Sequence, residues 1–226
     1  MTRINIITSI LISSTVLTGG IMVNAEETID NNGAQSNATI SFEENKEATD
    51  PVIPPTNPTD PTDPNGPDLP TGNKEPLRID IAPNFHFGQF TVGTGNKTAN
   101  NTRVNSNIQV TDGRGTLEGW TVLVARTEFK NKEHVLPSEL VLSPGLVKDG
   151  KNNYIELTGN IKTPVMVNSS TQPIFSATKN EGGGTYFQNF DDSRATLKFN
   201  SDIAKAGIYT AELTWTLTSG LNEGAR

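Results

Sequence analysis

The stretch "YTAELTWTL", residues 209–217, alternates apolar and polar side chains without interruption. Because successive side chains of a strand point to opposite faces of a sheet, this alternation predicts a β-strand with one apolar and one polar face. Two uses of the apolar face stay open. It packs in the core, or its aromatic rings contact a ligand, and Trp215 at the rim of a sandwich is the intermediate case. The apolar positions are Tyr209, Ala211, Leu213, Trp215 and Leu217.

From about Lys74 onward, short apolar segments are separated by Gly, Asn and Asp, which is typical of strands joined by turns. A helix of any length has no support, and the best candidates for a single helical turn lie near residues 138–142 and 202–206. We therefore predict an all-β, Ig-like or Greek-key-type β-sandwich for residues 74–226. The expected strands include "LRIDIA" (77–82), "FHFGQFTV" (85–92), "NIQVTD" (107–112), "GWTVLVARTEF" (119–129), "NYIELTG" (153–159), "VMVN" (165–168), "IFSAT" (174–178), "TYFQNF" (185–190) and "ATLKF" (195–199).

Residues 1–25 have the pattern of a secretory signal peptide. An apolar run follows Arg3 and closes on a small-x-small site, so we expect cleavage after Ala25. Ser, Thr and Gly interrupt the run, which argues against an uncleaved span of about 20 mainly apolar residues. A second hydrophobic run does not follow. We therefore expect an exported protein without a membrane span in its mature form.

Residues 26–73 form an acidic segment and a proline-rich spacer. The formal charge of the chain is −7, and this segment holds ten acidic side chains against Lys46 alone. Its first half is poor in large apolar groups and is predicted to be disordered. From Pro55 to Pro70 a proline occurs at every third residue, which favours a polyproline II spacer of about 3.1 Å per residue that holds the acidic tail clear of the domain. "LPTG", residues 69–72, is interpreted as a turn.

Composition argues against several kinds of activity. The chain has no Cys, which excludes disulfides, thiol catalysis and Cys-ligated metals. Residues 74–226 carry nearly balanced charge without a basic stripe, so nucleic acid is not an expected partner. His86 and His134 lack the spacing of zinc ligands, and Asp191-Asp192 is the one adjacent acidic pair of that region. We predict that the protein is not an enzyme and uses no catalytic residue, cofactor or metal.

Three motifs carry a resemblance to a known family. They are "FHFG" (85–88), "VTDGRGTLEGWTVLV" (110–124), and the terminal stretch in which Tyr209-x-x-x-Leu213 precedes Trp215-Thr216-Leu217. Together they resemble the WxL domain of Gram-positive surface proteins, from about residue 74 to the end of the chain. One departure is Val122 in the first motif, Trp120-Thr121-Val122, where the family usually has Leu.

The resemblance implies an all-β domain that attaches non-covalently to the cell wall through peptidoglycan and works with other surface proteins of the same gene cluster. It therefore implies a secreted protein on the cell surface. An adhesin, or a subunit of a multi-protein surface complex that binds a protein partner, is the alternative. Glu212, Thr214 and Thr216 on the polar face are equally credible contacts. The wall-binding residues that the motifs indicate, or core residues if the face is buried, are Trp120, Val122, Tyr209, Leu213, Trp215 and Leu217.

Overall fold

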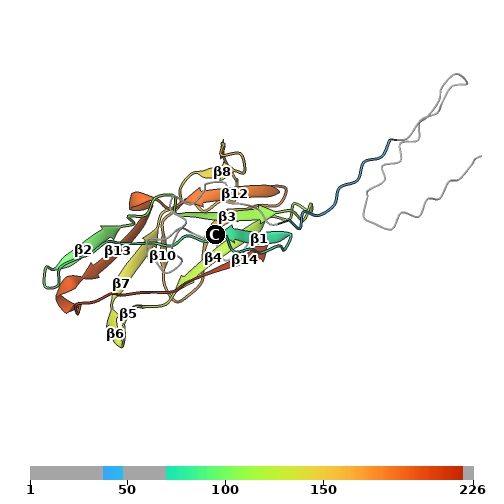
Figure 1. Cartoon of the computed structure of the whole chain (residues 1–226). Helices are drawn as coiled ribbons and strands as arrows, with labels where there is room; N and C mark the ends of the chain where they lie inside the picture. The colour runs from blue at the N-terminus through green and yellow to red at the C-terminus, as the bar shows by residue number, and fades with distance from the viewer. Residues whose placement is uncertain (1–37, 48–69, 221–226) are drawn as a thin grey trace, which may run out of the picture. The chain divides into compact units, whose positions relative to one another are not determined.

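Antiparallel strands make up three sheets and one hairpin in the computed structural model, which describes residues 38–47 and 70–220 (Figure 1). These strands lie in the compact unit that begins at Phe42. The five-stranded sheet has the order β1 (Leu77–Ile81), β3 (Asn107–Asp112), β12 (Gly184–Asn189), β8 (Val147–Asp149) and β9 (Tyr154–Ile155). The four-stranded sheet has the order β10 (Val165–Val167), β7 (Ser138–Leu142), β13 (Ala195–Asn200) and β2 (Asn96–Asn100).

The three-stranded sheet contains both tryptophans. Its order is β11 (Gln172–Ala177), β4 (Trp120–Arg126) and β14 (Leu213–Ser219). A separate hairpin pairs β5 (Phe129–Asn131) with β6 (His134–Leu136). Two single turns of 3-10 helix, η1 (Asp192–Arg194) and η2 (Ser201–Ile203), stand on either side of β13. Within the described residues, no helix is long and apolar enough to cross a membrane.

One hydrophobic core joins the three sheets. Ile108 and Val110 reach it from β3, and Leu140 comes from β7. Val122 and Val124 of β4 contribute from the three-stranded sheet, and all five residues are fully buried. Strands buried against a facing sheet are what the alternating pattern predicts. The prediction of an all-β sandwich is thus confirmed.

Two predicted elements are wrong. The stretch Ser138–Leu142, expected as a helical turn, is strand β7, which pairs with β10 on one side and β13 on the other. Leu140 and Leu142 of this strand are fully buried, so core packing on both neighbours outweighs the local helical preference. Conversely, the "FHFGQFTV" segment (85–92) forms no strand. The turn expected near 202–206 corresponds to η2, whose first residues are capped by the Asn200 side chain.

The "FHFG" segment is held by side chains and by single backbone bonds. The backbone N–H of His86 donates to Asn101 Oδ1 at 3.1 Å, and the His86 carbonyl accepts from the Thr102 backbone at 2.7 Å. Its alternation of aromatic and polar residues therefore reflects rings packed on the core from an irregular segment. Phe85 and Phe87 both pack there, half-buried.

The ends that flank the spacer are both bonded to the domain. Pro70 pairs with Ile81, and the Thr71 backbone N–H donates to the Asp80 carbonyl at 2.8 Å, so these two residues of the "LPTG" stretch, expected as a turn, are paired with β1. On the other side of the spacer, Asn45 donates to the Gly113 carbonyl at 2.9 Å. The expectation that the acidic segment stays clear of the domain is wrong at this point. Residues 48–69, on which the spacer prediction falls, lie outside the described residues, as do residues 1–37.

Candidate functional site

Strand β14 places the two tryptophan motifs side by side. All seven of its residues pair with β4, and Trp215 lies opposite Val124 while Leu217 lies opposite Val122. Directly opposite residues of an antiparallel pair share a face, so Trp215 and Leu217 point to the same side as two fully buried valines. The sequence pattern predicted the common face of Trp215 and Leu217. It did not predict that "WTV" and "WTL" lie on neighbouring strands.

Trp120 is a core residue. Its side chain is 0% exposed, and its ring packs edge-on against Phe175 with 4.7 Å between ring centroids. The indole Nε1 donates to the Gly182 carbonyl at 3.0 Å, so the one polar atom of the ring is satisfied inside the core. Val122 is equally buried. Neither side chain of the first motif reaches the surface.

Trp215 occupies the intermediate position between core and surface. It is half-buried and packs against the core. Its ring lies 6.4 Å from that of buried Phe190, which in turn has a T-shaped contact with Phe85 at 6.3 Å. Phe87 lies 6.3 Å from Phe85. We call Phe85, Phe87, Phe190 and Trp215 the aromatic rim. It brings the "FHFG" and "WTL" motifs together from opposite ends of the domain sequence.

Tyr209 and Leu213 complete the terminal motif. The Tyr209 hydroxyl is 2.7 Å from His134 Nδ1 and accepts the backbone N–H of Lys205 at 2.9 Å. This half-buried phenol therefore connects the β5–β6 hairpin to the loop before β14. Leu213 is also half-buried and lies opposite Arg126 at the start of the strand pairing. Both residues stabilise the approach to β14.

Arg126 fixes the same end of β4 to the four-stranded sheet. Its Nε donates to the Val167 carbonyl at 2.9 Å, and its Nη2 donates to the Ser138 carbonyl at 2.6 Å. The guanidinium also lies over the Phe129 ring, 5.4 Å from the centroid. Burial lowers the pKa of Arg126 from its usual range, and Glu128 opposes this shift.

Arg114 holds the other end of β14. It forms an ion pair with Asp112 at 2.8 Å, and its Nη1 donates to the Ser219 hydroxyl. A further bond runs from Nη2 to the Gly119 carbonyl at 2.8 Å. The hydrogen bond to Asp112 raises the pKa of Arg114. The "GRG" turn thereby ties the ends of β3, β4 and β14 to one another.

The polar face of β14 is open to solvent. Glu212, Thr214 and Thr216 are exposed, and Thr216 lies opposite Leu123 of β4. Because β14 is the edge strand of its sheet, a ligand at that edge can reach the polar face and approach the half-buried residue Trp215. Trp215 and the two threonines point to opposite faces of β14, so the strand presents an aromatic ring on one face and hydroxyl donors and acceptors on the other.

A concave surface lies beside β10 and β11 and is lined largely by residues 158–164, which precede β10. It is a polar groove of about 660 Å³, and the amides of Asn160, Asn168 and Gln172 line it together with Lys162 and Met166. Lys162 is engaged by Glu156 at 2.6 Å, which lowers the pKa of that carboxyl. The groove contains no residue of the three family motifs.

The titratable groups considered for catalysis each have local partners. His86 Nδ1 is 2.9 Å from the Thr102 hydroxyl, and His134 Nδ1 contacts Tyr209. Asp191 Oδ1 accepts the backbone N–H of Ser106 at 2.9 Å. In the described ranges 38–47 and 70–220, no group of three His, Asp or Glu side chains could hold a metal ion.

Fold and site together define an all-β sandwich domain in which an edge strand, β14, carries a half-buried tryptophan. The chain belongs to the WxL family, because the family model described as "WxL domain surface cell wall-binding" matches residues 30–220. The matched range begins before the proline-rich spacer and therefore includes residues 45–47. Comparisons with curated proteins and with solved structures found no match. The family assignment supports a place at the cell surface with the cell wall as partner.

Gly182 is expected to tolerate no larger residue, because it packs directly against the Trp120 indole, whose Nε1 donates to the Gly182 carbonyl. A Cβ there would lie 2.5 Å from Trp120 Nε1 and from Ala177 Cβ, and its φ is +79°. We expect Gly182→Ala to lower the free energy of unfolding by about 2–4 kcal/mol, from backbone strain and overpacking combined. Urea unfolding of the mature chain measures the loss.

Gly184→Ala is the matched control for this prediction. Gly184 has φ +95° and open space around its Cβ position, so that variant carries backbone strain without the clash. We expect it to lose about 1–2 kcal/mol. Equal losses in the two variants would contradict the tight packing of Trp120 against Gly182.

Proposed function

We propose that this protein is held at the cell wall by non-covalent binding of its WxL domain to peptidoglycan, and that it is not an enzyme. The family match carries the first part, since the family is a surface cell wall-binding one. Peptidoglycan is the wall component that the resemblance implies. His86 and His134 each contact a hydroxyl at Nδ1, that of Thr102 and that of Tyr209, where the histidine of a catalytic triad contacts a carboxylate, and this supports a binding role.

The contact surface that fits a glycan best is the exposed side of β14. Trp215 is half-buried, and an indole ring is the kind of side chain on which the apolar face of a sugar ring stacks. Thr214 and Thr216 add exposed hydroxyls that can exchange hydrogen bonds with sugar hydroxyls. Trp120 and Val122 support this surface from inside the core, because β4 fixes the position of β14.

Trp215→Ala is expected to reduce wall binding without unfolding the domain. A half-buried side chain loses less burial on truncation than a core one, so we expect a fall in melting temperature of no more than about 8 °C. The measurement is the fraction of mature chain that sediments with purified peptidoglycan. We expect the Kd derived from it to rise about tenfold, which is a loss of about 1.4 kcal/mol of binding free energy. Sacculi with and without attached wall polymers show which component is bound.

Two further variants make this test specific. Trp215→Phe keeps an aromatic ring on the rim and should retain most of the binding. Thr214→Val replaces a hydroxyl on the polar face at similar volume and should weaken binding if glycan lies along both faces. If Trp215→Ala binds peptidoglycan as well as the unaltered chain, the Trp215 ring is not part of the contact surface. Soluble muropeptides released during the incubation would contradict the non-enzymatic role.

A protein partner is the second candidate, as expected for an adhesin or a subunit of a surface complex. It is favoured by the β8–β9 hairpin at the end of the five-stranded sheet, where Tyr154 is 69% and Leu146 66% exposed. Exposed apolar side chains at a sheet edge are typical of protein contacts. If the mature chain stays in the supernatant of the peptidoglycan assay, this hairpin becomes the favoured contact surface.

A further inference from the structure

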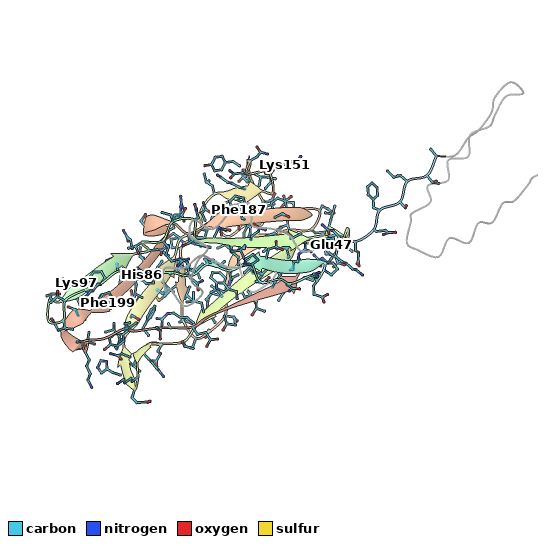
Figure 2. All side chains as sticks on the ribbon, viewed as in Figure 1. Glu47, His86, Lys97, Lys151, Phe187 and Phe199 are labelled. Atoms are coloured by element: carbon cyan, nitrogen blue, oxygen red, sulfur yellow. The ribbon has the colours of Figure 1, made fainter. Side chains whose placement is uncertain are left out.

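Residues Asn45–Glu47, which we call the strap, are bound to the end of the five-stranded sheet although 29 residues separate Glu47 from Leu77, the first residue of β1. The backbone N–H of Asn45 donates to Gly113 at 2.9 Å. Its carbonyl accepts from Arg78 Nη1 at 3.4 Å, and the Glu47 carbonyl accepts from Arg78 Nη2 at 2.6 Å. Figure 2 shows Glu47 at this end of the sheet.

Arg78 is an unusual partner for these carbonyls because its side chain is 0% exposed. Its Nε forms an ion pair with Asp80 at 3.0 Å, and its Nη1 also donates to the Glu75 carbonyl at 3.0 Å. Buried guanidinium N–H groups are costly when they lose their acceptors. The strap carbonyls are therefore part of what allows this cation to be buried.

Asp80 is fixed in turn by the neighbouring strand. Its Oδ2 accepts from Thr111 at 2.6 Å and from Gln109 at 3.2 Å, and both side chains are buried. The guanidinium of Arg78 is thus oriented before the strap arrives, by an ion pair anchored on β3. A preorganised donor loses little entropy when it binds, which favours a specific site.

Gly113 provides the close approach on the other side of the strap. A Cβ at this residue would lie 2.6 Å from the Asn45 carbonyl oxygen and 2.8 Å from Asn45 Cβ. Its φ lies outside the left-handed region, so a side chain is excluded there by the strap and not by the backbone conformation of Gly113. Glycine at this point of the chain is explained by strap binding.

The site contacts the main chain of the strap. The three bonds to the domain use the Asn45 N–H, the Asn45 carbonyl and the Glu47 carbonyl. The Lys46 side chain is instead 67% exposed and pairs with Glu44 at 3.2 Å, in solvent. Main-chain hydrogen bonds of this kind are also what gives affinity when proteins bind extended peptides.

We propose that Arg78 and Gly113 form a main-chain peptide site whose occupant is the strap of the same molecule. The acidic segment is then attached to the domain at two places, through the spacer and through the strap. This proposal does not rest on peptidoglycan binding, because the site is formed by Arg78 of β1 and Gly113 of the turn after β3, and by no residue of β14. It also gives a physical reason for a family match that begins before the spacer.

Hydrogen–deuterium exchange of the mature chain tests the proposal directly. The Asn45 amide should exchange at least about tenfold more slowly than in an unstructured peptide of the same sequence. Gly113→Ala should remove this protection. Gly183→Ala is the matched control, because its Cβ meets only the end of the Leu117 side chain and lies away from the strap. Lys46→Ala should leave the protection unchanged, since its side chain makes no contact with the site.

Asn45→Pro keeps the test decisive if Gly113→Ala fails to fold. It removes the donated N–H from the strap itself and leaves the sheet unaltered. In a mature chain cut by a protease at a site introduced between residues 55 and 60, the N-terminal fragment should co-elute with the domain, and Asn45→Pro should release it. Exchange at the unstructured rate in the unaltered chain would overturn the proposal. Co-elution at the mass of two or more chains would overturn the intramolecular assignment.

Discussion

Arg78→Met is expected to lower the free energy of unfolding by about 3–5 kcal/mol, because it removes one partner of a fully buried ion pair. The Asp80 carboxylate would stay buried, with side-chain bonds from Thr111 and Gln109 but without a compensating cation. The strap would also lose the donors to two of its carbonyls. Urea unfolding of the mature chain, followed by tryptophan fluorescence, measures the change.

The double variant Arg78→Met with Asp80→Leu is the control for this prediction. Replacing both members of a buried pair by apolar side chains avoids the uncompensated charge and often costs far less than breaking the pair. We expect it to recover at least half of the loss in the single variant. A single variant that unfolds like the unaltered chain would show that the ion pair is not buried in solution.

The penalty for Arg78→Met should also depend on pH. Burial raises the pKa of the Asp80 carboxyl above its usual range, and hydrogen bonds from Thr111 and Gln109 together with Arg78 oppose the rise. Because the pKa of this carboxyl is higher in the folded than in the unfolded state, its protonation stabilises the folded state. This stabilisation is complete at pH below the pKa of the unfolded state and is lost as pH rises through the pKa of the folded state. Removal of Arg78 raises that pKa further. The loss of stability should therefore be smaller at pH 4 than at pH 7.

Trp120→Ala is expected to cost about 3–5 kcal/mol, which is typical of a large aromatic side chain removed from a packed core. The ring is 0% exposed, contacts Phe175 and Tyr186, and leaves the Gly182 carbonyl without its donor when it is removed. Much of a marginally stable domain's free energy would be lost. Thermal unfolding and near-UV circular dichroism of the mature chain measure the effect.

Comparison with Trp215→Ala separates structural from contact roles. Trp120→Ala should lose wall binding in proportion to the fraction unfolded, whereas Trp215→Ala should lose binding while folded. Trp120→Phe is the intermediate control, because it keeps an aromatic ring but removes the indole N–H. We expect Trp120→Phe to fold and to bind the wall. A folded Trp120→Ala domain that fails to bind would contradict the core assignment.

An element could be predicted from the sequence when its pattern depends on neighbouring residues, and could not when it depends on segments distant in sequence. Strand β14 was foreseeable in part. Its alternation reflects one half-buried and one exposed face, but the strand covers Leu213–Ser219, so residues 209–212 of the expected strand lie before it. Strand β7 was not foreseeable, because it pairs with β10 and β13, which are distant in sequence, and because Leu140 and Leu142 are buried in the common core. The "FHFG" segment misled for the opposite reason. Phe85 and Phe87 pack on Phe190 and Phe129, which explains the aromatic residues in this segment, but its backbone forms no strand.

The candidate site divides in the same way. That Trp215 and Leu217 share a face is a property of strand geometry, so residues 209–217 were enough to establish it. Whether each tryptophan touches solvent depends on strand order. Trp120 is in the middle strand of its sheet, covered by Phe175 and Tyr186, whereas Trp215 is on the end strand.

Local sequence therefore specified an all-β chain and the orientation of its last strand, because alternation and turn residues act within a few positions of one another. Burial of Arg78 with Asp80 and the attachment of the strap depend on segments more than thirty residues apart meeting at one end of a sheet. Arg78 and Asp80 share one face of the expected strand "LRIDIA" (77–82), and charged side chains on a strand face are ordinarily exposed. Packing turned that face into an interior one, since an ion pair with all its partners in place can be buried where an isolated charge cannot.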